Sequence, residues 1–551
     1  MLQGFVPWPE ERARAYRARG YWEGLSIFDM VARSAARHPG KEALVCGGRR
    51  IAYAELVSSS ERLACRLMEQ GLKPLDRVVM QLPNTPDFVF TYLALTRIGA
   101  IPVMALRTHR ASEVRHFITA SGAASYFIPD EHARFDYRPM ARSLAGECRS
   151  LKSVFVAGDP GQGQLALKPL IEESVEPGRI ARALEGVKPD PQDVATMLLS
   201  GGTTSISKLI PRTHNDYVLN ARLCGAAARF DAGTVFMAIL PLGHNYNLAS
   251  PGMLGTFYYG GTVVIAASGG AEEVFGLVER ERVSVIAAVV PLITGWLNSD
   301  APAKYDLGSL KLIQNGGARL APELRRRMRE RLGCTPQEIY GTAEGLINMV
   351  RPDDPEELVL QSSGAPVCED DEIRVIDDEG REVPDGAEGE LVTRGPYTIN
   401  GYYDAPEKNR EAFTADGFYR MGDIVRKRGR YVFAEGRKKD LINRGGEKIS
   451  CEEVENLILR HPSVRSVSLV AMPDERFGEK ACAFVILREG ETLGFEELNA
   501  FLRSQDIASF KLPERLEIVR EFPVSPVGKI LKRELRERIA AQLARETAAG
   551  D

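Results

Sequence analysis

The chain has 551 residues, of which 44% are hydrophobic and 26% are charged, as in an ordinary globular protein and not in a disordered one. Lys and Arg number 71 against 75 Asp and Glu, so the broad basic surface of a nucleic-acid-binding protein is not expected. The eight cysteines are spread along the chain without a C-x-x-C pair, which argues against a disulfide framework or a zinc site.

The N-terminal segment is charged and amphipathic and lacks the apolar core of a secretory signal. No run of about eighteen apolar residues occurs in the chain, which argues against a transmembrane helix. These absences predict a cytoplasmic protein without a membrane partner. The length also exceeds what one hydrophobic core usually serves, so two or more domains are expected.

From about residue 26 to residue 300, amphipathic helical stretches alternate with short apolar strands. Residues 29–40 predict a helix that stops at Pro39-Gly40, and residues 87–100 predict a helix that ends at Gly99. Apolar strands are expected at residues 77–83, 234–240, 261–266 and 283–290. Strands that alternate with helices predict an α/β fold with mostly parallel sheets covered by helices.

A small, hydroxyl-rich turn at residues 200–208 follows an apolar strand that ends at Leu199. Gly201 and Gly202 would let backbone N–H groups approach an anion, and Lys208 would add a positive charge. Further hydroxyl donors are Ser200, Thr203 and Thr204. The turn does not fit the Walker pattern G-x-x-x-x-G-K-[ST], so it predicts phosphate binding of another kind, with a flexible surface loop as the alternative.

After about Gly364 the sequence changes to short strands separated by Gly, Pro and Asp. These strands are expected at residues 372–377, 389–395 and 417–433. The pattern predicts a β-rich subdomain over about 364–436. Beyond it, mixed α/β character returns, and Ser450 and Glu453 form a capping-box pattern before a helical run.

These changes along the chain predict its domain organisation. A large N-terminal domain is expected over residues 1–436, with the β-rich subdomain at its end. A small α+β domain of about 110 residues, a sensible size for an independent domain, is expected over 441–551. The charged segment 437–440 would link the two.

Five further segments follow the phosphate-binding turn: 340–344 (YGTAE), 389–396 (GELVTRGP), 419–423 (YRMGD), 436–440 (GRKKD) and 528–529 (GK). In this order and spacing, they resemble the core motifs of the adenylate-forming superfamily, which contains acyl-CoA synthetases, nonribosomal peptide synthetase adenylation domains and luciferases. A closer resemblance, to stand-alone aryl-acid adenylating enzymes such as 2,3-dihydroxybenzoate–AMP ligase, is carried by residues 4–11, 208–217, 242–252 and 442–456.

The resemblance implies that the chain uses ATP and Mg²⁺ to convert a small aromatic acid to its aryl-AMP, with release of pyrophosphate. The acyl group would then pass to the phosphopantetheine thiol of an aryl carrier protein, as in siderophore biosynthesis and nonribosomal peptide synthesis. The acid would resemble 2,3-dihydroxybenzoate, or 3-hydroxypicolinate or hydroxyanthranilate. Two alternatives stay open: an aryl-CoA ligase of the same fold, and a non-catalytic paralogue that only binds a ligand.

The resemblance also assigns roles to nucleotide-binding residues. Glu344 would help to coordinate magnesium, Asp423 would bind the ribose hydroxyls, and Arg437 would contact ATP or the ribose. Lys529 would bridge the substrate carboxylate and the α-phosphate, because the attack of one anion on another requires charge neutralisation. Lys439 would be the hinge about which a mobile small domain rotates. The other ATP contacts would come from Ser200, Gly201, Gly202, Thr203, Thr204, Lys208, Gly317, Tyr340, Gly341 and Thr342.

The acid pocket is expected around residues 244–250. By resemblance, Asn245 and Ser250 would face the hydroxyl substituents of the ring, and Tyr246 would pack against the ring. His244 would gate the pocket near the carboxylate and act in catalysis. The other lining residues would be Asn315, Gly316, Ile339 and Ile347.

Two of these positions bear on the identity of the acid. Ser250 favours a pocket for 2,3-dihydroxybenzoate, because salicylate-selective relatives tend to carry Cys there. Asn315 is an anomaly, because dihydroxybenzoate ligases have a small apolar residue at that position. A buried amide needs a hydrogen-bond partner, so a ring nitrogen, an amino group or an extra hydroxyl stays open as its ligand.

The chain departs from the superfamily pattern at four positions. The phosphate-binding turn commonly ends T-G-x-P-K, but here Ser205 and Ser207 replace the Gly and the Pro before Lys208, which is expected to be catalytic. Met421 stands where a Thr usually precedes Gly-Asp. Ala343 replaces a Thr, although aryl-acid members also tend to have Ala there. The altered turn is the reason to keep the non-catalytic paralogue as an alternative.

Overall fold

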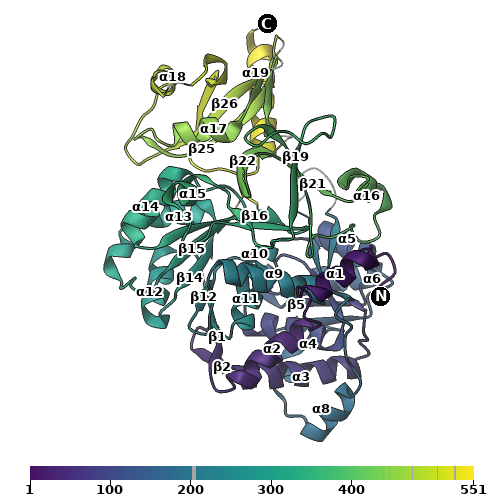
Figure 1. Ribbon diagram of the computed structural model, residues 1–551. Helices are drawn as coiled ribbons and strands as arrows, with labels where there is room; N and C mark the ends of the chain where they lie inside the picture. Colours follow the sequence, from purple (N-terminus) through teal and green to yellow (C-terminus); the bar gives the residue numbers. More distant parts are fainter. Residues whose placement is uncertain are drawn as a thin grey trace.

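The computed structural model describes residues 1–200, 207–437, 440–445, 447–474, 476–505, 507–525 and 529–550. Figure 1 shows a large body built from the N-terminal part of the chain and a smaller body at the C-terminal end, which sits on one edge of the large one. Helices cover two large sheets, and two smaller sheets follow in the chain. This arrangement confirms the predicted α/β class with a β-rich subdomain and a small C-terminal domain.

The first large sheet has nine strands in the order β18-β17-β16-β15-β14-β12-β13-β1-β2. Its central strands, from β16 to β1, are parallel, so their carboxyl ends lie at one edge. The strands are β1 (Glu42–Cys46), β2 (Arg49–Ala52), β12 (Val235–Ala238), β13 (Thr262–Ile265), β14 (Val285–Ala288), β15 (Leu312–Gly316), β16 (Thr335–Thr342), β17 (Gly345–Met349) and β18 (Ala365–Pro366).

Two different layers of helices bury the faces of this sheet. On one face, Phe275, Trp296 and Met328 pack against Ile286 and Ile313. These three side chains come from α12 (Ala271–Glu281), α13 (Val290–Leu297) and α14 (Pro322–Leu332). The other face packs against α9 (His214–Ala227), α10 (Asn245–Ala249) and α11 (Gly252–Tyr258), in a core shared with the second sheet.

The second large sheet has seven strands in the order β11-β10-β4-β3-β5-β8-β9, and only β11 runs antiparallel to its neighbour. The strands are β3 (Arg77–Met80), β4 (Ile101–Met104), β5 (Ser125–Pro129), β8 (Ser153–Ala157), β9 (Leu165–Ala166), β10 (Val194–Leu199) and β11 (Leu209–Thr213). A short hairpin joins β6 (Glu131–His132) to β7 (Phe135–Asp136).

Helices also cover both faces of the second sheet. One face packs against α5 (Ala111–Ser121) and α6 (Arg138–Glu147). The other face packs against α3 (Tyr53–Glu69) and α4 (Pro86–Ile98) in the shared core, which α2 (Ile27–Arg37) joins. The remaining helices of the large body are α1 (Glu10–Ala18), α7 (Leu167–Glu172), α8 (Pro177–Leu184), α15 (Glu356–Gln361) and α16 (Pro406–Ala412).

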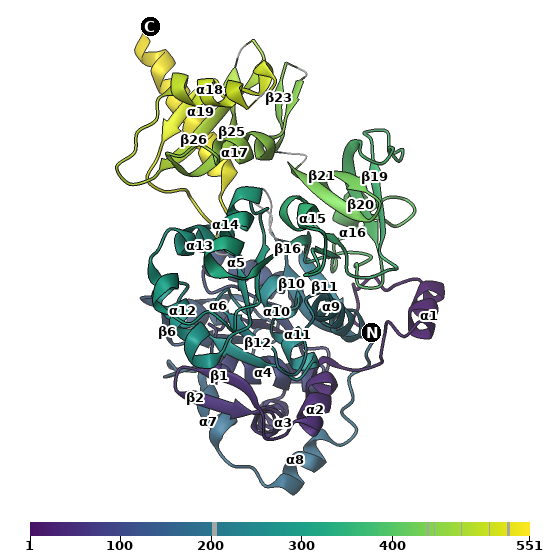
Figure 2. The ribbon, with the colours of Figure 1, turned by 60° about the vertical axis from the view of Figure 1, so that its left-hand side comes forward.

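The β-rich subdomain and the small domain lie at the same end of the large body (Figure 2). The subdomain is a four-stranded antiparallel sheet of β19 (Glu372–Ile376), β20 (Glu388–Arg394), β21 (Tyr419–Arg428) and β22 (Tyr431–Arg437). The small domain has a sheet of β23 (Ile442–Arg444), β24 (Glu447–Ile449), β25 (Val464–Asp474), β26 (Gly478–Leu487) and β27 (Arg515–Ile518). Its helices are α17 (Cys451–Ile458), α18 (Phe495–Ser504) and α19 (Lys532–Gly550).

Helix ends test the sequence predictions most directly. The helix α4 ends before Gly99, whose φ of 70° is in the left-handed region that favours glycine, which confirms the prediction. The capping box predicted at α17 is half formed. The Ser450 hydroxyl accepts a hydrogen bond from the Glu453 N–H at 3.3 Å, but the Glu453 carboxylate binds Lys511 at 2.6 Å. The hinge residue Lys439 lies outside the described residues.

Two predictions about chemistry can be compared with the fold. All eight cysteines are free, and seven of them are buried, as expected for thiols without a structural bridge. Within the described ranges, no helix combines the length and the apolar character needed to cross a membrane.

Candidate active site

A small cavity lies where the carboxyl ends of β12, β14 and β15 meet the small domain. Its lining residues are Leu240, Pro241, His244, Tyr246, Val289, Gly316, Gly317 and Lys529. Ligand sites in open α/β sheets lie beyond the carboxyl ends of parallel strands, so this position is the one expected for a substrate pocket. The structure therefore brings Lys529 to His244 and Tyr246, although it is far from them in the sequence.

The wall of this cavity is apolar and closely packed. A Cβ atom at Gly316 would lie 2.9 Å from Cζ of Tyr246, so the ring can lie against the strand only because residue 316 is glycine. Ile339 pairs with Gly316 across the parallel strands, and therefore lies on the same face of the sheet. Ile347 packs beside Gly341, where a Cβ atom would lie 2.8 Å from Cδ1 of Ile347. Tyr246, Ile339 and Ile347 all belong to one buried core.

A chain of buried hydrogen bonds holds the polar residues near the pocket. The Tyr217 hydroxyl donates to Oδ1 of Asn245 at 2.9 Å, and Nδ2 of Asn245 donates to the Ser250 hydroxyl at 3.3 Å. Nδ2 of Asn220 donates to the Ala249 carbonyl at 2.6 Å. Asn245 and Ser250 are thus brought together as predicted and are held by α9.

Sequence reasoning did not select Tyr217 and Asn220. Both lie on α9, three residues apart and hence on one face, and both are fully buried. Polar side chains buried on a helix need partners, and this is the signal that could have marked them.

His244 caps the short helix α10, where its Nδ1 accepts a hydrogen bond from the Tyr246 N–H at 3.3 Å. Burial, together with the positive charge of Lys529, lowers the pKa of His244 to about 4. The ring is therefore neutral near pH 7. Because Nδ1 accepts a hydrogen bond, we assign the proton to Nε2, which can donate to an anion.

Asn315 does not join the pocket group. Successive residues of a strand point to opposite faces, and Gly316 faces Tyr246. The Asn315 amide donates to the Ala318 carbonyl at 2.7 Å and to Glu338 Oε2 at 3.0 Å. The partners of its Nδ2 therefore come from the protein, on the face of the sheet opposite to Tyr246, whereas its buried Oδ1 has no hydrogen-bond partner among the described residues.

Glu338 itself is part of a buried ion pair below the pocket floor. Arg325 lies 3.0 Å from its carboxylate, and both side chains are almost completely buried. Burial raises the pKa of Glu338, while Arg325 opposes that rise. The Asn315 amide adds one more hydrogen bond to this carboxylate, as a buried charge requires.

The phosphate-binding turn is closed at its base. The Ser200 N–H donates to the Lys208 carbonyl at 3.0 Å, and the Lys208 N–H donates to the Ser200 hydroxyl at 2.9 Å. The expected phosphate ligands Gly201, Gly202, Thr203 and Thr204 lie outside the described residues, as does Ser205. The closed base is what a loop that cradles an anion needs at its ends.

Tyr402 connects Lys208 to Glu344. The Lys208 ammonium lies 4.3 Å from the centroid of the Tyr402 ring, and the Tyr402 hydroxyl donates to Oε1 of Glu344 at 2.8 Å. A cation over an aromatic face is attracted by the ring quadrupole. The predicted phosphate-binding lysine and the predicted magnesium ligand are thus neighbours, joined by a tyrosine that sequence reasoning did not select.

Glu344 lies in the turn between β16 and β17. The Thr342 hydroxyl donates to the Gly345 carbonyl at 2.9 Å, which holds this turn. A Cβ at Gly341 would lie 2.2 Å from the Leu346 carbonyl oxygen, so a larger residue does not fit there. The predicted ATP contacts Gly341 and Thr342 therefore shape the turn that presents Glu344.

The buried Arg212 fixes this turn from the other side. Its Nε donates to Asp216 at 2.7 Å, and its two Nη atoms donate to the carbonyls of Ala343 at 2.9 Å and Tyr397 at 3.1 Å. Arg212 lies on β11, the strand that follows the phosphate-binding turn. One guanidinium therefore joins that strand to the Glu344 turn.

The predicted ribose ligand Asp423 lies beside another predicted ATP contact. The Tyr340 hydroxyl donates to Oδ2 of Asp423 at 2.7 Å, and Asp423 is nearly buried on β21. Its neighbour across the sheet is Arg437, the last residue of β22. The structure describes the backbone of Arg437 but not its side chain, so its predicted contact with ATP stays a prediction.

The residues near Glu344 suit magnesium that arrives with the nucleotide. No group of three or more His, Cys, Asp or Glu side chains that could hold a metal occurs in the described part of the chain. Mg²⁺ is commonly held by one or two carboxylates together with water and substrate phosphates. One carboxylate, Glu344, beside a phosphate-binding turn fits this pattern.

Lys529 reaches the pocket from the small domain. Gly317 has a φ of 86°, and a Cβ there would lie 3.1 Å from Cε of Lys529, so glycine allows both the turn and the approach of the lysine. The Lys529 N–H donates to the Ser525 hydroxyl at 3.1 Å, and the Ser525 N–H donates to the Lys529 carbonyl at 2.7 Å. The predicted ATP contact Gly317 and the predicted catalytic Lys529 are thus adjacent.

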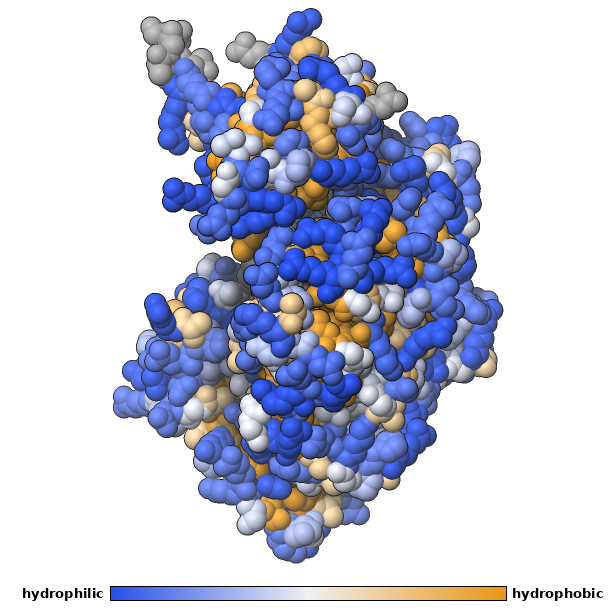
Figure 3. Space-filling model, turned by 90° about the vertical axis from the view of Figure 1, so that its left-hand side faces the viewer, coloured by the Kyte–Doolittle hydropathy of each residue, from blue (hydrophilic) through white to orange (hydrophobic). Residues whose placement is uncertain are grey.

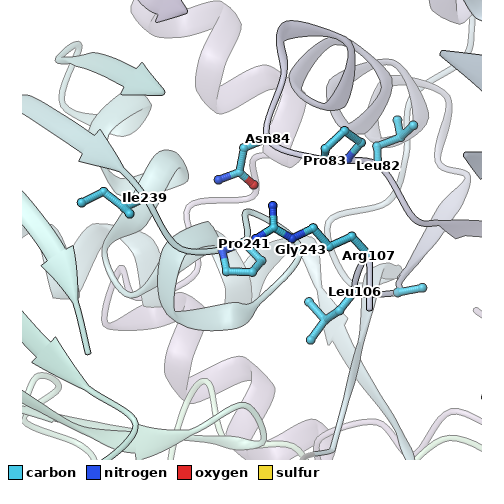
Figure 4. Close-up of a pocket in the computed structure, with 9 residues that line it drawn as sticks. Leu82, Pro83, Asn84, Leu106, Arg107, Ile239, Pro241 and Gly243 are labelled. Atoms are coloured by element: carbon cyan, nitrogen blue, oxygen red, sulfur yellow. The ribbon is translucent and has the colours of Figure 1, made fainter. Parts of the chain in front are cut away.

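A second small cavity lies beside the strand end that leads to His244 (Figure 4). Its lining residues are Leu82, Pro83, Asn84, Ala105, Leu106, Arg107, Ile239, Pro241 and Gly243. Asn84 fixes this strand end by donating to the Leu240 carbonyl and by accepting from the Leu242 N–H, both at 2.8 Å. Pro241 lines both cavities, so the segment around it separates them.

Taken together, Lys208 and Glu344 meet at Tyr402, Asp423 lies beside Tyr340, and Lys529 of the small domain lines an apolar pocket, which are the groups expected of a nucleotide-dependent enzyme with two domains. The family model "AMP-binding enzyme" matches residues 31–403, and the model "AMP-binding enzyme C-terminal domain" matches residues 453–529. The chain therefore belongs to the AMP-binding, adenylate-forming enzyme family, which confirms the resemblance read from its motifs.

Individual relatives align with nearly the whole chain. The 2,3-dihydroxybenzoate-AMP ligase of Bacillus subtilis is 45% identical, over 98% of this chain and 99% of the relative. A salicylyl-CoA synthase / salicylate adenylyltransferase of a Streptomyces species is 44% identical, over 97% of each protein. The apo structure of Mycobacterium smegmatis MbtA is 39% identical, with a TM-score of 0.74 over 97% of this chain and 99% of that one.

Proposed function

We propose that the protein activates an aryl acid with ATP, forming the aryl-AMP and pyrophosphate, and then transfers the acyl group of the acid to a thiol with release of AMP. The observation that supports this most is the position of Lys529, which a separate domain brings against Gly317 at the edge of an aromatic pocket. The aryl-acid ligase names of the full-length relatives agree with it.

In the first half-reaction, a carboxylate oxygen of the acid attacks the α-phosphorus of ATP. A bond from that oxygen to the α-phosphorus forms, and the bond to the β-phosphate oxygen breaks, so pyrophosphate leaves. Lys529 neutralises the approaching carboxylate and α-phosphate, while Lys208 neutralises the departing phosphates. The neutral His244 donates from Nε2 to the carboxylate and orients it for in-line attack.

Two carboxylates would bind different parts of the nucleotide. Glu344, positioned by Tyr402, would hold Mg²⁺, which supplies charge neutralisation at the phosphates when it is bound with ATP. Asp423, positioned by Tyr340, accepts hydrogen bonds from the ribose hydroxyls.

Lys439 is proposed as the hinge about which the small domain then withdraws Lys529 from the pocket.

We propose an acid of the 2,3-dihydroxybenzoate type. Asn245 and Ser250 offer adjacent polar groups to ring hydroxyls, and Tyr246, Ile339 and Ile347 enclose the ring. The case for a nitrogen-bearing acid rested on Asn315, but that side chain lies on the face of the sheet opposite to Tyr246, where its Nδ2 donates to Glu338 and Ala318. The acids 3-hydroxypicolinate and hydroxyanthranilate are therefore the less supported candidates.

The proposed acceptor is the phosphopantetheine thiol of an aryl carrier protein, in the cytoplasm, as in siderophore biosynthesis. The cavity in Figure 4 adjoins the acid pocket at Pro241, which lines both, and is the proposed binding place of the acceptor. Arg107 gives this cavity a cation that could pair with a phosphate. Coenzyme A is the second candidate acceptor, because the Streptomyces relative is named a salicylyl-CoA synthase.

The proposal is tested by ATP–pyrophosphate exchange with a panel of aryl acids, followed by thioester formation with carrier protein or coenzyme A. We expect exchange with 2,3-dihydroxybenzoate well above that with benzoate, because a site that hydrogen-bonds a substituent rejects an analogue without it. Transfer to the carrier protein should exceed transfer to coenzyme A. Absence of exchange with every acid would contradict catalysis and favour a ligand-binding paralogue.

A further inference from the structure

An ion pair and a hydrogen bond between side chains join the small domain to the large one. Arg319 donates from Nη1 to Oε1 of Glu452 at 2.9 Å, and this ion pair is partly buried. At the outer edge of the same contact, Arg488 donates to Asn298 at 3.2 Å. Figure 3 shows that the molecule narrows where the two domains meet and that the surface there is largely hydrophilic.

The position of Arg319 links this ion pair to the catalytic lysine. Arg319 lies two residues after Gly317, the residue against which Cε of Lys529 packs. A second hydrogen bond, to the Gln361 carbonyl at 2.6 Å, fixes the guanidinium on the large domain. The loop that receives Lys529 therefore also carries the cation that binds the small domain.

On the other side, Glu452 is connected to the segment that carries Lys529. Glu452 lies in the first turn of α17, and Glu455, one turn further along, binds Lys532 at 2.7 Å. Lys532 follows Lys529 by three residues and begins α19. The contacts form a closed circuit, from the 317–319 loop through α17 to Lys532 and back through Lys529 to Gly317.

We propose that Arg319 and Glu452 are positioning residues that hold the small domain in the orientation in which Lys529 enters the pocket. The proposal rests on the proposed function, with its two half-reactions. The pair would act in aryl-AMP formation alone and would separate before thioester formation, when the small domain rotates. Burial raises the pKa of Glu452 to about 7, although Arg319 opposes the rise.

Rates of the two half-reactions, measured for Arg319→Gln and Glu452→Gln, distinguish this positioning role from a general structural role. We expect kcat of ATP–pyrophosphate exchange to fall about tenfold in each variant, because the loss of one charged hydrogen bond leaves its partner uncompensated. Thioester formation from supplied aryl-AMP should stay within about twofold of wild type. The double variant should lose no more than either single variant, as expected for residues that act as one pair.

A matched control is Arg329→Gln, which removes an exposed ion pair with Glu356 inside the large domain. This variant should change neither half-reaction. Equal losses in both half-reactions of the Arg319 and Glu452 variants, or no loss in either, would overturn the proposal.

Small-angle X-ray scattering of the same proteins distinguishes this failure from failure of the proposed function. If the pair holds the domains together, both Gln variants should show a broader distribution of interatomic distances than wild type and Arg329→Gln. If wild type exchanges pyrophosphate with none of the aryl acids but the Gln variants still show the broader distribution, the proposed function is contradicted and the domain contact is supported. If wild type exchanges pyrophosphate normally and the variants keep the scattering and kinetics of wild type, only the proposed role of the ion pair is contradicted.

Discussion

The acid pocket and the nucleotide side of the site are built in different ways. Apart from Lys529, the lining residues of the pocket belong to the large domain, where Tyr217, Asn245 and Ser250 form a buried hydrogen-bond chain and Gly316 receives the ring of Tyr246. The nucleotide side combines Glu344 and Asp423 from the large body with Lys529 from the small domain. The residues proposed to recognise the acid are thus held by packing within the large domain, whereas the positive charge proposed to activate it comes from Lys529 of the small domain.

The largest effect should come from Lys529→Ala, which removes the part of the site that arrives from the small domain. We expect aryl-AMP formation to fall by several orders of magnitude, because an oriented charge at a reacting anion contributes about 3–4 kcal/mol. Thioester formation from supplied aryl-AMP should be much less affected. Rapid-quench assays of the two half-reactions measure both rates, and equal losses would contradict the role of Lys529.

Replacing Asp371 should change the pH dependence of the unfolding free energy strongly and leave the recognition of the acid unchanged. This buried carboxylate accepts a hydrogen bond from the Tyr397 hydroxyl at 2.5 Å, and burial raises its pKa to about 7. The folded state therefore binds the proton more tightly than the unfolded chain between about pH 4 and pH 7, so the free energy of unfolding falls as the pH rises through that window. Between pH 5 and pH 8, the unfolding free energy of wild type should fall by about 2–3 kcal/mol more than that of Asp371→Asn.

Urea unfolding of wild type and Asp371→Asn at several pH values measures this difference. The acid preference should be the same in both proteins, because Asp371 supports the large body from outside the pocket. Parallel pH profiles of the unfolding free energy would show that Asp371 does not titrate in this window.

The rigidity of the pocket is tested by Gly316→Ala. The added Cβ would lie 2.9 Å from the Tyr246 ring, which must then shift toward the space for the acid. Overpacking of this kind costs about 1–3 kcal/mol, so we expect kcat/KM for the aryl acid to fall about 10- to 100-fold. The matched control is Gly295→Ala on α13, where a Cβ meets no atom within 4 Å. Similar exchange rates for Gly316→Ala and the control would show that the pocket is not closely fitted.

The smallest effect on catalysis is expected from Asn315→Val. The amide lies on the face of the sheet opposite to Tyr246, so the ratio of kcat/KM for 2,3-dihydroxybenzoate and for nitrogen-bearing acids should change less than about threefold. The variant should lose about 1 kcal/mol of stability, since Glu338 loses one donor. A shift in acid preference of about 1–3 kcal/mol would instead return Asn315 to the pocket.

The sequence predicted the general fold well because its signals are local. The helix α4 ends at Gly99 because a left-handed residue favours glycine, and such a position is marked in the sequence itself. The face to which Asn315 points depends on the register of β15 against β16, and the motif alone does not give that register. The capping box at α17 was half right because Glu453 binds Lys511, far away in the chain, in place of the helix end.

Within the site, motifs found the groups expected to meet ligands but missed the residues that hold them. Tyr402 lies far from Lys208 and Glu344 in the sequence, yet it contacts both. Tyr217 and Asn220 look like ordinary polar positions of a helix until their burial is known. Supporting residues of this kind are defined by packing between distant segments, which a single sequence does not show.

The hydrogen bonds of Arg212 have a consequence for how this site can vary between relatives. Its two Nη atoms bind the main-chain carbonyls of residues 343 and 397 and do not contact the side chains there. A change from Thr to Ala at position 343 therefore leaves the bond intact, because every amino acid has the same carbonyl. The Glu344 turn can keep its place while the residues around it are exchanged, and mutations can alter the acid pocket without rebuilding the nucleotide machinery.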